Sequence, residues 1–365
     1  MKMQVQELTQ ACDKSNVSHR IPWVDYGKGL AIILVFWGHT VCPQPIRDFL
    51  YAFHMPLFYF LSGYVYNIAH YASLRMLLWR KFRTLLVPGV ILGIVCRVLD
   101  YCNALATGTA TDDPHIMQRA IGLVLELRGG SYWVIPWFFT SLFMVEVLAY
   151  LVFRLTRGRV AALLLIGFLS SLIGYAYCIV VGKTVPWAVE TALTGLLFFL
   201  LGYVSCHAFA ELFDRMTAGR MLLVWLAVTM FCSWATRTFD CTNLDIYANQ
   251  YGSYPLYLMG AVAGILMAVT LCKSLALVAA KNVGRVLDYV GRNSLVFYCF
   301  NQLALAVVLE ILQTCGLFRG ELNLAWQSAG IIIVAIACCL CVPLVVFVNR
   351  FVPGVLGKRP IIPRS

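Results

Sequence analysis

"GLAIILVFWGHTV", residues 29–41, is the stretch that decides the fold class. Ten apolar or glycine residues run from Gly29 to Gly38 without a charge, and His39 follows them. Such a run is typical of a helix that crosses a lipid bilayer, and further apolar stretches along the chain support this interpretation. A polar side chain inside such a helix costs several kcal/mol unless it is paired or used. His39 is therefore a candidate for a functional residue.

Further apolar stretches make the chain an all-α polytopic membrane protein. Of its 365 residues, 61% are hydrophobic and 12% are charged, whereas soluble domains have about 25% charged residues. The mean hydropathy is +0.80. We predict about ten transmembrane helices, at roughly 29–46, 49–68, 85–102, 133–153, 160–181, 188–206, 220–237, 254–272, 290–315 and 326–349.

The basic residues indicate how these helices are oriented. If alternate segments lie on opposite sides, 20 Lys and Arg residues fall on the side of the termini and seven on the other, with Lys28 at a border. This positive-inside bias predicts that both termini are cytoplasmic. We expect no cleavable signal peptide, a cytoplasmic segment 1–28, a membrane domain 29–350 and a cytoplasmic tail 351–365. The net charge of +11 then reflects topology, and we expect no nucleic-acid partner.

The 14 cysteines are scattered through the apolar stretches. Even the cluster "CCLC" at 338–341 lies inside the last predicted span. Small apolar packing residues explain this distribution, because buried free cysteine behaves as a small hydrophobe. We therefore predict neither a metal site nor a disulfide framework.

Lys28 and His39 are eleven residues apart, which on a helix leaves them about 20° out of phase and about 16 Å apart along the axis. With Lys28 at the cytoplasmic border, His39 is expected near the centre of a hydrocarbon layer about 30 Å thick. Asp25, three residues before Lys28, lies on nearly the same face and could pair with it. Such a pair is either part of a site or an ordinary interfacial ion pair.

The second predicted span contains "FHMPLFYFLSGY", residues 53–64. His54 is expected near the outer surface, and Ser62 with Gly63 deeper, where small residues let a ligand or another helix approach. The two histidines and Ser62 could line one shaft between the first two helices. Ser62 is also readily explained as a packing residue.

Arg80 and Arg83 lie in the predicted inside loop "LRMLLWRKFRTLLVPG". Two guanidinium groups one turn apart could bind the phosphates of a nucleotide-containing cofactor. Basic inside loops are common in membrane proteins, so the alternative is an ordinary topology signal. Glu146 and Glu310 lie inside predicted spans, where a carboxylate could orient the histidine or bind hydroxyl groups.

These motifs together resemble acyltransferase family 3, and more narrowly its fucose 4-O-acetylase-like branch. The resemblance rests on "WVDYGKGLAIILVFWGH", "FHMPLFYFLSGY" and "RKFR", and extends to "WFFTSLFMVEVLAY" at 137–150 and "VGRNSLVFYCFNQ" at 290–302. Members have a basic residue, ten intervening residues and a histidine, as Lys28 and His39 do, and an Arg-x-x-Arg pair, as Arg80 and Arg83 do. Asn301 stands where relatives often have a histidine.

The resemblance implies a multi-pass enzyme of a bacterial inner membrane. It would move an acyl group, usually acetyl, from cytoplasmic acyl-CoA to a hydroxyl of a glycan or lipid-linked sugar. Site residues would be His39, Lys28, Asp25 and His54 for catalysis, and Arg80, Arg83 and Ser62 for acetyl-CoA. His39 would act as a general base or as a transient acyl carrier.

Two other function classes were weighed against an enzyme. A transporter of sugars or lipid-linked glycans would suit ten spans, but it should show paired half-chain repeats, and no convincing repeat is visible. A non-catalytic assembly partner would not need Lys28, His39 and Arg80 in register. The sequence leaves the acceptor, the acyl group and the oligomeric state open.

Overall fold

The computed structural model describes residues 20–40, 42–106, 136–240, 244–278, 281–316, 324–354 and 356. Over these residues the chain is helical and has no strand apart from an isolated bridge between Asp245 and Gln250. The all-α prediction is confirmed. The helices are α2 (Pro22–Gly38), α3 (Gln44–Tyr64), η1 (Ile68–His70), α4 (Leu74–Lys81), η2 (Phe82–Leu86), α5 (Val87–Ala106), α7 (Trp137–Thr156), α8 (Val160–Val180), η3 (Pro186–Ala188), α9 (Val189–His207), α10 (Ala210–Met216), η4 (Gly219–Met221), α11 (Leu222–Asp240), α12 (Tyr254–Leu277), α13 (Lys281–Arg292), α14 (Ser294–Thr314) and α15 (Leu324–Phe351).

Eight of these helical segments, within the described ranges, are long and apolar enough to cross a membrane. They coincide with the last eight predicted spans, and α2 and α3 lie at the first two. α2 has 17 residues, about 25 Å at 1.5 Å per residue. The chain is therefore a polytopic membrane protein, and the count of ten spans stays a prediction.

The largest boundary difference concerns the third predicted span. Leu74–Leu99 is one continuous helical segment, built from α4, the π-helical turn η2 and α5. We expected residues 74–84 to form an inside loop, because Arg80, Lys81 and Arg83 interrupt their hydrophobicity. That prediction is wrong: Ser73 accepts a hydrogen bond from the Met76 amide and begins the helix there.

α2 begins earlier and ends earlier than predicted. It starts at Pro22, so Asp25 and Lys28 belong to the first helix and not to a segment before it. It ends at Gly38, and His39 is its C-cap. The predicted span 29–46 placed His39 inside the first helix, and this is wrong, because "VCPQP" at 41–45 places two prolines where the helix would have continued.

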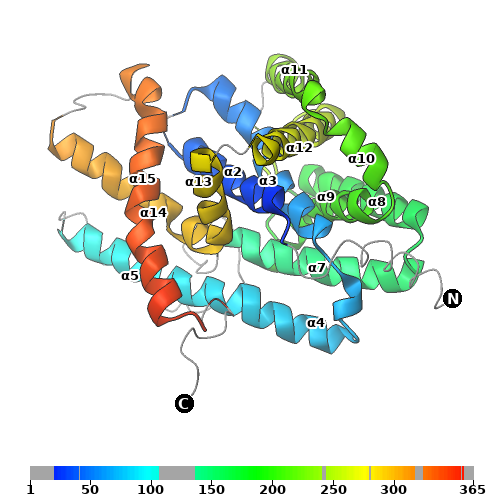
Figure 1. Ribbon diagram of the computed structural model, residues 1–365. Coiled ribbons are helices and arrows are strands. Elements are labelled where there is room, and N and C mark those ends of the chain that lie inside the picture. Colours follow the sequence, from blue (N-terminus) through cyan, green and yellow to red (C-terminus); the bar gives the residue numbers. More distant parts are fainter. Residues whose placement is uncertain are drawn as a thin grey trace.

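α2 and α3 lie at the centre of the helix assembly (Figure 1). α2 contacts α3, α12, α13, α14 and α15, and α3 contacts α9, α11 and α12 as well. Glycines allow two of these helix pairs to approach closely. A Cβ on Gly29 would lie 2.1 Å from the Leu287 carbonyl oxygen of α13, and one on Gly63 would lie 1.9 Å from that of Phe199 in α9. This packing fixes the frame that carries both histidines.

The orientation of this frame in the bilayer stays a prediction, which reporter fusions test directly. Reporters that work only outside the cytoplasm, fused after residues 46, 120 and 245, should be active because those positions belong to the segments poor in Lys and Arg. A fusion after residue 365 should be inactive. Activity of that last fusion would contradict a cytoplasmic C-terminus.

Candidate active site

A cavity of about 520 Å³ receives side chains from α2, α3, α5, α7, α14 and the segment before α12. It contains both predicted histidines. Its lining residues are Val35, His39, Tyr51, His54, Met55, Gly93, Cys96, Arg97, Pro136, Trp137, Asp245, Tyr247, Tyr298, Cys299, Asn301, Gln302, Leu303 and Ala306. Its size is within the usual range for small-molecule sites.

His39 reaches the cavity from the C-terminal end of α2, and its side chain is exposed. Its backbone amide donates to the carbonyls of Val35 and Phe36, at 3.1 and 3.2 Å, which holds the residue against the last turn. The Tyr51 ring lies near both histidines, with ring-centroid distances of 6.4 Å to His39 and 4.9 Å to His54. An accessible imidazole on a fixed backbone suits proton transfer with a bound molecule.

His54 is buried and has a defined orientation. Its Nδ1 lies 2.7 Å from the Leu50 carbonyl oxygen, one turn earlier in α3. A carbonyl only accepts, so Nδ1 carries the proton, and in the neutral ring Nε2 is then the acceptor. His54 can therefore accept a hydrogen bond from a hydroxyl group in the cavity.

Asn301 is 6% exposed and lines the same cavity from α14. Its Nδ2 donates to the Tyr298 carbonyl, which fixes the amide orientation. Its Oδ1 is buried and has no hydrogen-bond partner in the part of the chain that the structure describes. Orphaned buried acceptors are costly and uncommon, so this oxygen is a second candidate for contact with a bound donor group.

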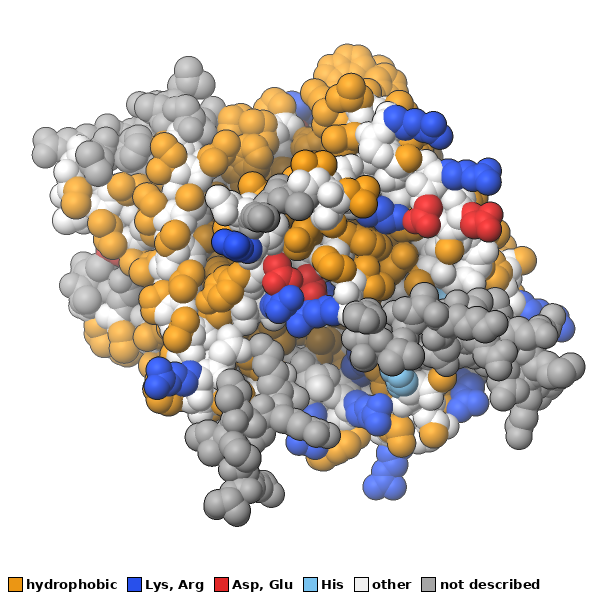
Figure 2. Space-filling view, viewed as in Figure 1, with side chains coloured by type: hydrophobic (Ala, Val, Ile, Leu, Met, Phe, Trp, Pro, Cys, Tyr) orange, Lys and Arg blue, Asp and Glu red, His pale blue; other side chains and the backbone are white. Residues whose placement is uncertain are grey.

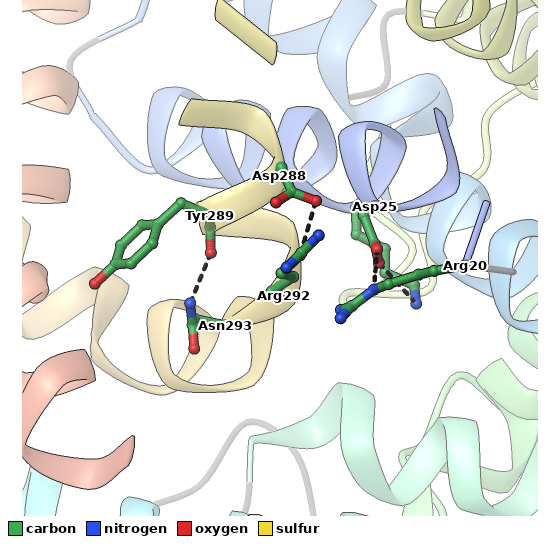
Figure 3. A network of polar contacts seen from close by, with 7 residues as sticks. Arg20, Asp25, Asp288, Tyr289, Arg292 and Asn293 are labelled. Atoms are coloured by element: carbon green, nitrogen blue, oxygen red, sulfur yellow. Dashed lines mark hydrogen bonds and ion pairs between the residues drawn. The ribbon is translucent and has the colours of Figure 1, made fainter. Parts of the chain in front are cut away.

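Asp25 and Lys28 lie in the N-terminal half of α2, whereas His39 follows its C-terminal end. Arg20 Nε is 2.5 Å from Asp25 Oδ2, and Lys28 Nζ is 3.9 Å from Asp25 Oδ1. Figure 3 shows the Arg20–Asp25 contact beside the Asp288–Arg292 pair of α13. Near the centre of the face in Figure 2, acidic and basic side chains form a small group surrounded by hydrophobic side chains.

The predicted ion pair of Asp25 and Lys28 is therefore present, and Arg20 extends it. Lys28 and His39 both belong to α2 or its C-cap, and eleven helical residues correspond to about 16 Å along the axis. Lys28 lies in the N-terminal half of α2 and His39 at its C-cap, and only His39 lines the cavity.

Arg80 and Arg83 are exposed on the helical segment α4–η2. Arg80 Nη1 donates to the His70 carbonyl at 3.1 Å, and Arg83 lies over the Trp79 ring at 5.8 Å. Neither arginine lines the cavity. Arg83 lies within a π-helical turn, a feature that occurs frequently at functional sites.

Three predicted candidates lie away from the histidine cavity. Ser62 is half-buried on α3, two turns beyond His54, and is not among the lining residues. Glu146 pairs with Lys81 at 2.7 Å, and neither it nor Glu310 lines the cavity. The shaft of two histidines and Ser62 is therefore reduced to the two histidines, because Ser62 lies about 12 Å further along α3.

Several cavity residues were absent from the sequence-based site. Trp137 and Tyr247 lie with ring centroids 5.7 Å apart, and Asp245 and Arg97 add charged groups. Among these residues, only Asp245 could have been recognised from the sequence as a site candidate, because it is a carboxylate beside the aromatic-rich stretch at 247–257. Within the described residues no three His, Cys, Asp or Glu side chains form a group able to hold a metal ion.

A comparison with protein families identifies the class to which this fold and site belong. A family model described as an acyltransferase domain matches residues 21–346. The chain therefore belongs to acyltransferase family 3 and is a membrane acyltransferase, which transfers groups other than aminoacyl groups. No curated protein matches the sequence. The match covers α2 through most of α15, so the site described above lies within the family domain.

Proposed function

We propose that the protein is an O-acetyltransferase of the fucose 4-O-acetylase-like branch. It moves an acetyl group from cytoplasmic acetyl-CoA to a hydroxyl of a cell-envelope or exopolysaccharide sugar. One observation carries the proposal: His39 and His54, from two different helices, line one cavity, while Lys28 and its ion-pair partner Asp25 lie in the N-terminal half of the helix that ends before His39. A bacterial inner membrane is the proposed location.

In the proposed reaction, His39 takes the proton of the acceptor hydroxyl as its oxygen attacks the thioester carbonyl. The new C–O bond forms, the C–S bond breaks, and coenzyme A leaves as a thiolate that recovers a proton from the imidazolium. His54 Nε2 orients the acceptor through a neighbouring hydroxyl. A second route, in which His39 first accepts the acetyl group and then passes it to the hydroxyl, uses the same residues.

The donor site is proposed at the other end of α2. Arg80 and Arg83, one turn apart and exposed, would bind the phosphates, and Lys28 would add a cation whose position is fixed by Asp25. The distance of about 16 Å from Lys28 to His39 is comparable to the length of a pantetheine arm. Ser62 lies near the C-terminal end of α3, next to Leu61, which packs against Gly27 of α2, and would contact the part of that arm close to Lys28.

The acceptor site is proposed in the cavity itself. Trp137 and Tyr247 line the cavity with ring centroids 5.7 Å apart, and aromatic side chains pack well against the apolar face of a sugar ring. Asp245, Gln302 and the orphaned Oδ1 of Asn301 provide groups that accept hydrogen bonds. This mixture of aromatic and polar side chains suits a glycan better than an apolar acceptor.

Transfer itself is tested with purified protein in detergent, radiolabelled acetyl-CoA and a panel of lipid-linked glycans. The proposal expects label in a glycan product and none without enzyme. The alternative function, a transporter of sugars or lipid-linked glycans, expects uptake into proteoliposomes without a labelled product. Glycan uptake together with absence of label in every acceptor would contradict the proposed function.

The donor site makes a separate prediction. Arg80→Gln and Arg83→Gln should each weaken acetyl-CoA binding about 10- to 100-fold, because each removes a charge-assisted hydrogen bond to phosphate. Equilibrium binding of radiolabelled acetyl-CoA measures this without any acceptor. Arg75→Gln, on an exposed turn of the same helix, is the matched control. Wild-type donor affinity in both variants would identify these arginines as topology signals.

A further inference from the structure

The carbonyl of Gly38, the last residue of α2, is held by two side chains of α3. Arg47 donates to its oxygen from Nε at 3.3 Å and from Nη2 at 3.2 Å. Tyr51 donates to the same oxygen from its hydroxyl at 3.4 Å. The last carbonyls of a helix have no hydrogen-bond partner inside the helix. These side chains therefore supply donors for a backbone acceptor that α2 itself leaves unpaired.

The two donors form one unit. Arg47 and Tyr51 are four residues apart on one face of α3, and the guanidinium lies 5.9 Å from the Tyr51 ring centroid. The Tyr51 ring also packs on Gly38, where a Cβ would lie 2.7 Å from Tyr51 Cε2. A cation at the C-terminal end of a helix is favourable for the helix dipole. The contact therefore requires a glycine on α2 and a cation on α3.

This contact lies directly beside the two histidines. Gly38 precedes His39 in the chain, and the Tyr51 ring contacts the rings of both His39 and His54. The start of α3 is itself anchored, because Asp48 accepts from Gln44 at 2.7 Å and from Arg237 of α11 at 2.8 Å. The end of α2 is thus tied to an element that is fixed independently.

We propose that Arg47 and Tyr51 are positioning residues that hold His39 at the distance from His54 that transfer requires. They act through the Gly38 carbonyl and do not touch the reacting atoms. The proposal rests on the proposed catalytic role of His39. Without the contact, the last turn of α2 would fray and the imidazole would sample positions away from the acceptor hydroxyl.

Kinetics with a matched control test this role. Arg47→Met keeps the aliphatic stem and should lower kcat about 10- to 100-fold, since loss of positioning by about 1 Å has effects of this size. Acetyl-CoA affinity should stay within about 2-fold. Arg47→Lys, which keeps a cation and a donor, should recover most of the loss, and Tyr51→Phe should lower kcat less than Arg47→Met. Arg154→Met, which removes the same kind of contact of an arginine with a tyrosine hydroxyl and a backbone carbonyl but lies outside the cavity, is the control.

Hydrogen–deuterium exchange gives a second readout that needs no acceptor. In Arg47→Met the amides of His39 and Thr40 should exchange about 10-fold faster, consistent with loss of a charged hydrogen bond. Unchanged exchange would overturn the proposal, and so would faster exchange with wild-type kcat, or an equal loss of kcat in Arg154→Met. An active His39→Ala protein would overturn the proposed function instead, while the exchange result would still report on the contact.

Discussion

His39→Ala should insert and fold like the wild-type protein and lose about 10²- to 10⁴-fold in transfer rate, the usual cost of removing a general base. The structure supports normal folding, because His39 follows the last residue of α2 and its side chain is exposed. Transfer of radiolabel at saturating acetyl-CoA measures the effect. Acetyl-CoA affinity should change little, since the imidazole lies about 16 Å from Lys28 along α2.

Two further variants sharpen this test. His39→Gln keeps a hydrogen-bonding group but cannot shuttle a proton, so it should be nearly as impaired as His39→Ala. His207→Ala is the matched control, because His207 stacks on Tyr203 at 4.1 Å and lies outside the cavity. Wild-type turnover in His39→Gln would mean that the imidazole has only a hydrogen-bonding role, and the proposed reaction would be abandoned.

The helices were predictable because each must present about 20 mostly apolar residues to lipid, a constraint that the sequence displays directly. The ends were less predictable, since they depend on local chemistry. Pro22 and the prolines at 43 and 45 move α2 several residues toward the N-terminus, so that His39 ends the helix. The basic residues Arg80 and Arg83 led us to predict a loop, yet both lie on a helical segment, where their side chains are exposed.

The site was predictable only where its residues lie close together in the chain. His39 and His54 belong to consecutive helices, and their shared cavity follows from a short connection. Trp137, Asp245 and Asn301 come from three distant segments, and no periodicity shows which distant residues meet. The contact of Arg47 with Gly38 depends on the turn between two helices. Such contacts require the packed structure.

The ion pair of Lys81 and Glu146 was likewise not predictable from the sequence, because it joins residues 65 positions apart. The two atoms lie 2.7 Å apart, with side chains 20% and 5% exposed. Glu146 Oε2 has no hydrogen-bond partner among the described residues, and neither does the buried Tyr66 hydroxyl. Burial of two charges costs free energy that only their mutual attraction offsets, so removal of one partner should be far worse than removal of both.

We therefore expect Lys81→Met and Glu146→Leu each to lower the free energy of unfolding by about 3–5 kcal/mol, because each leaves one buried charge without compensation. The double variant should be close to wild-type, since two apolar side chains of similar length replace the pair. Thermal denaturation in detergent, followed by tryptophan fluorescence, compares the three variants. Arg292→Gln breaks the pair with Asp288, which is partly exposed, and should cost at most about 1 kcal/mol. If the double variant were as unstable as the sum of the single variants, the two charges would act independently, and Glu146 would owe its place in the membrane domain to contacts other than Lys81.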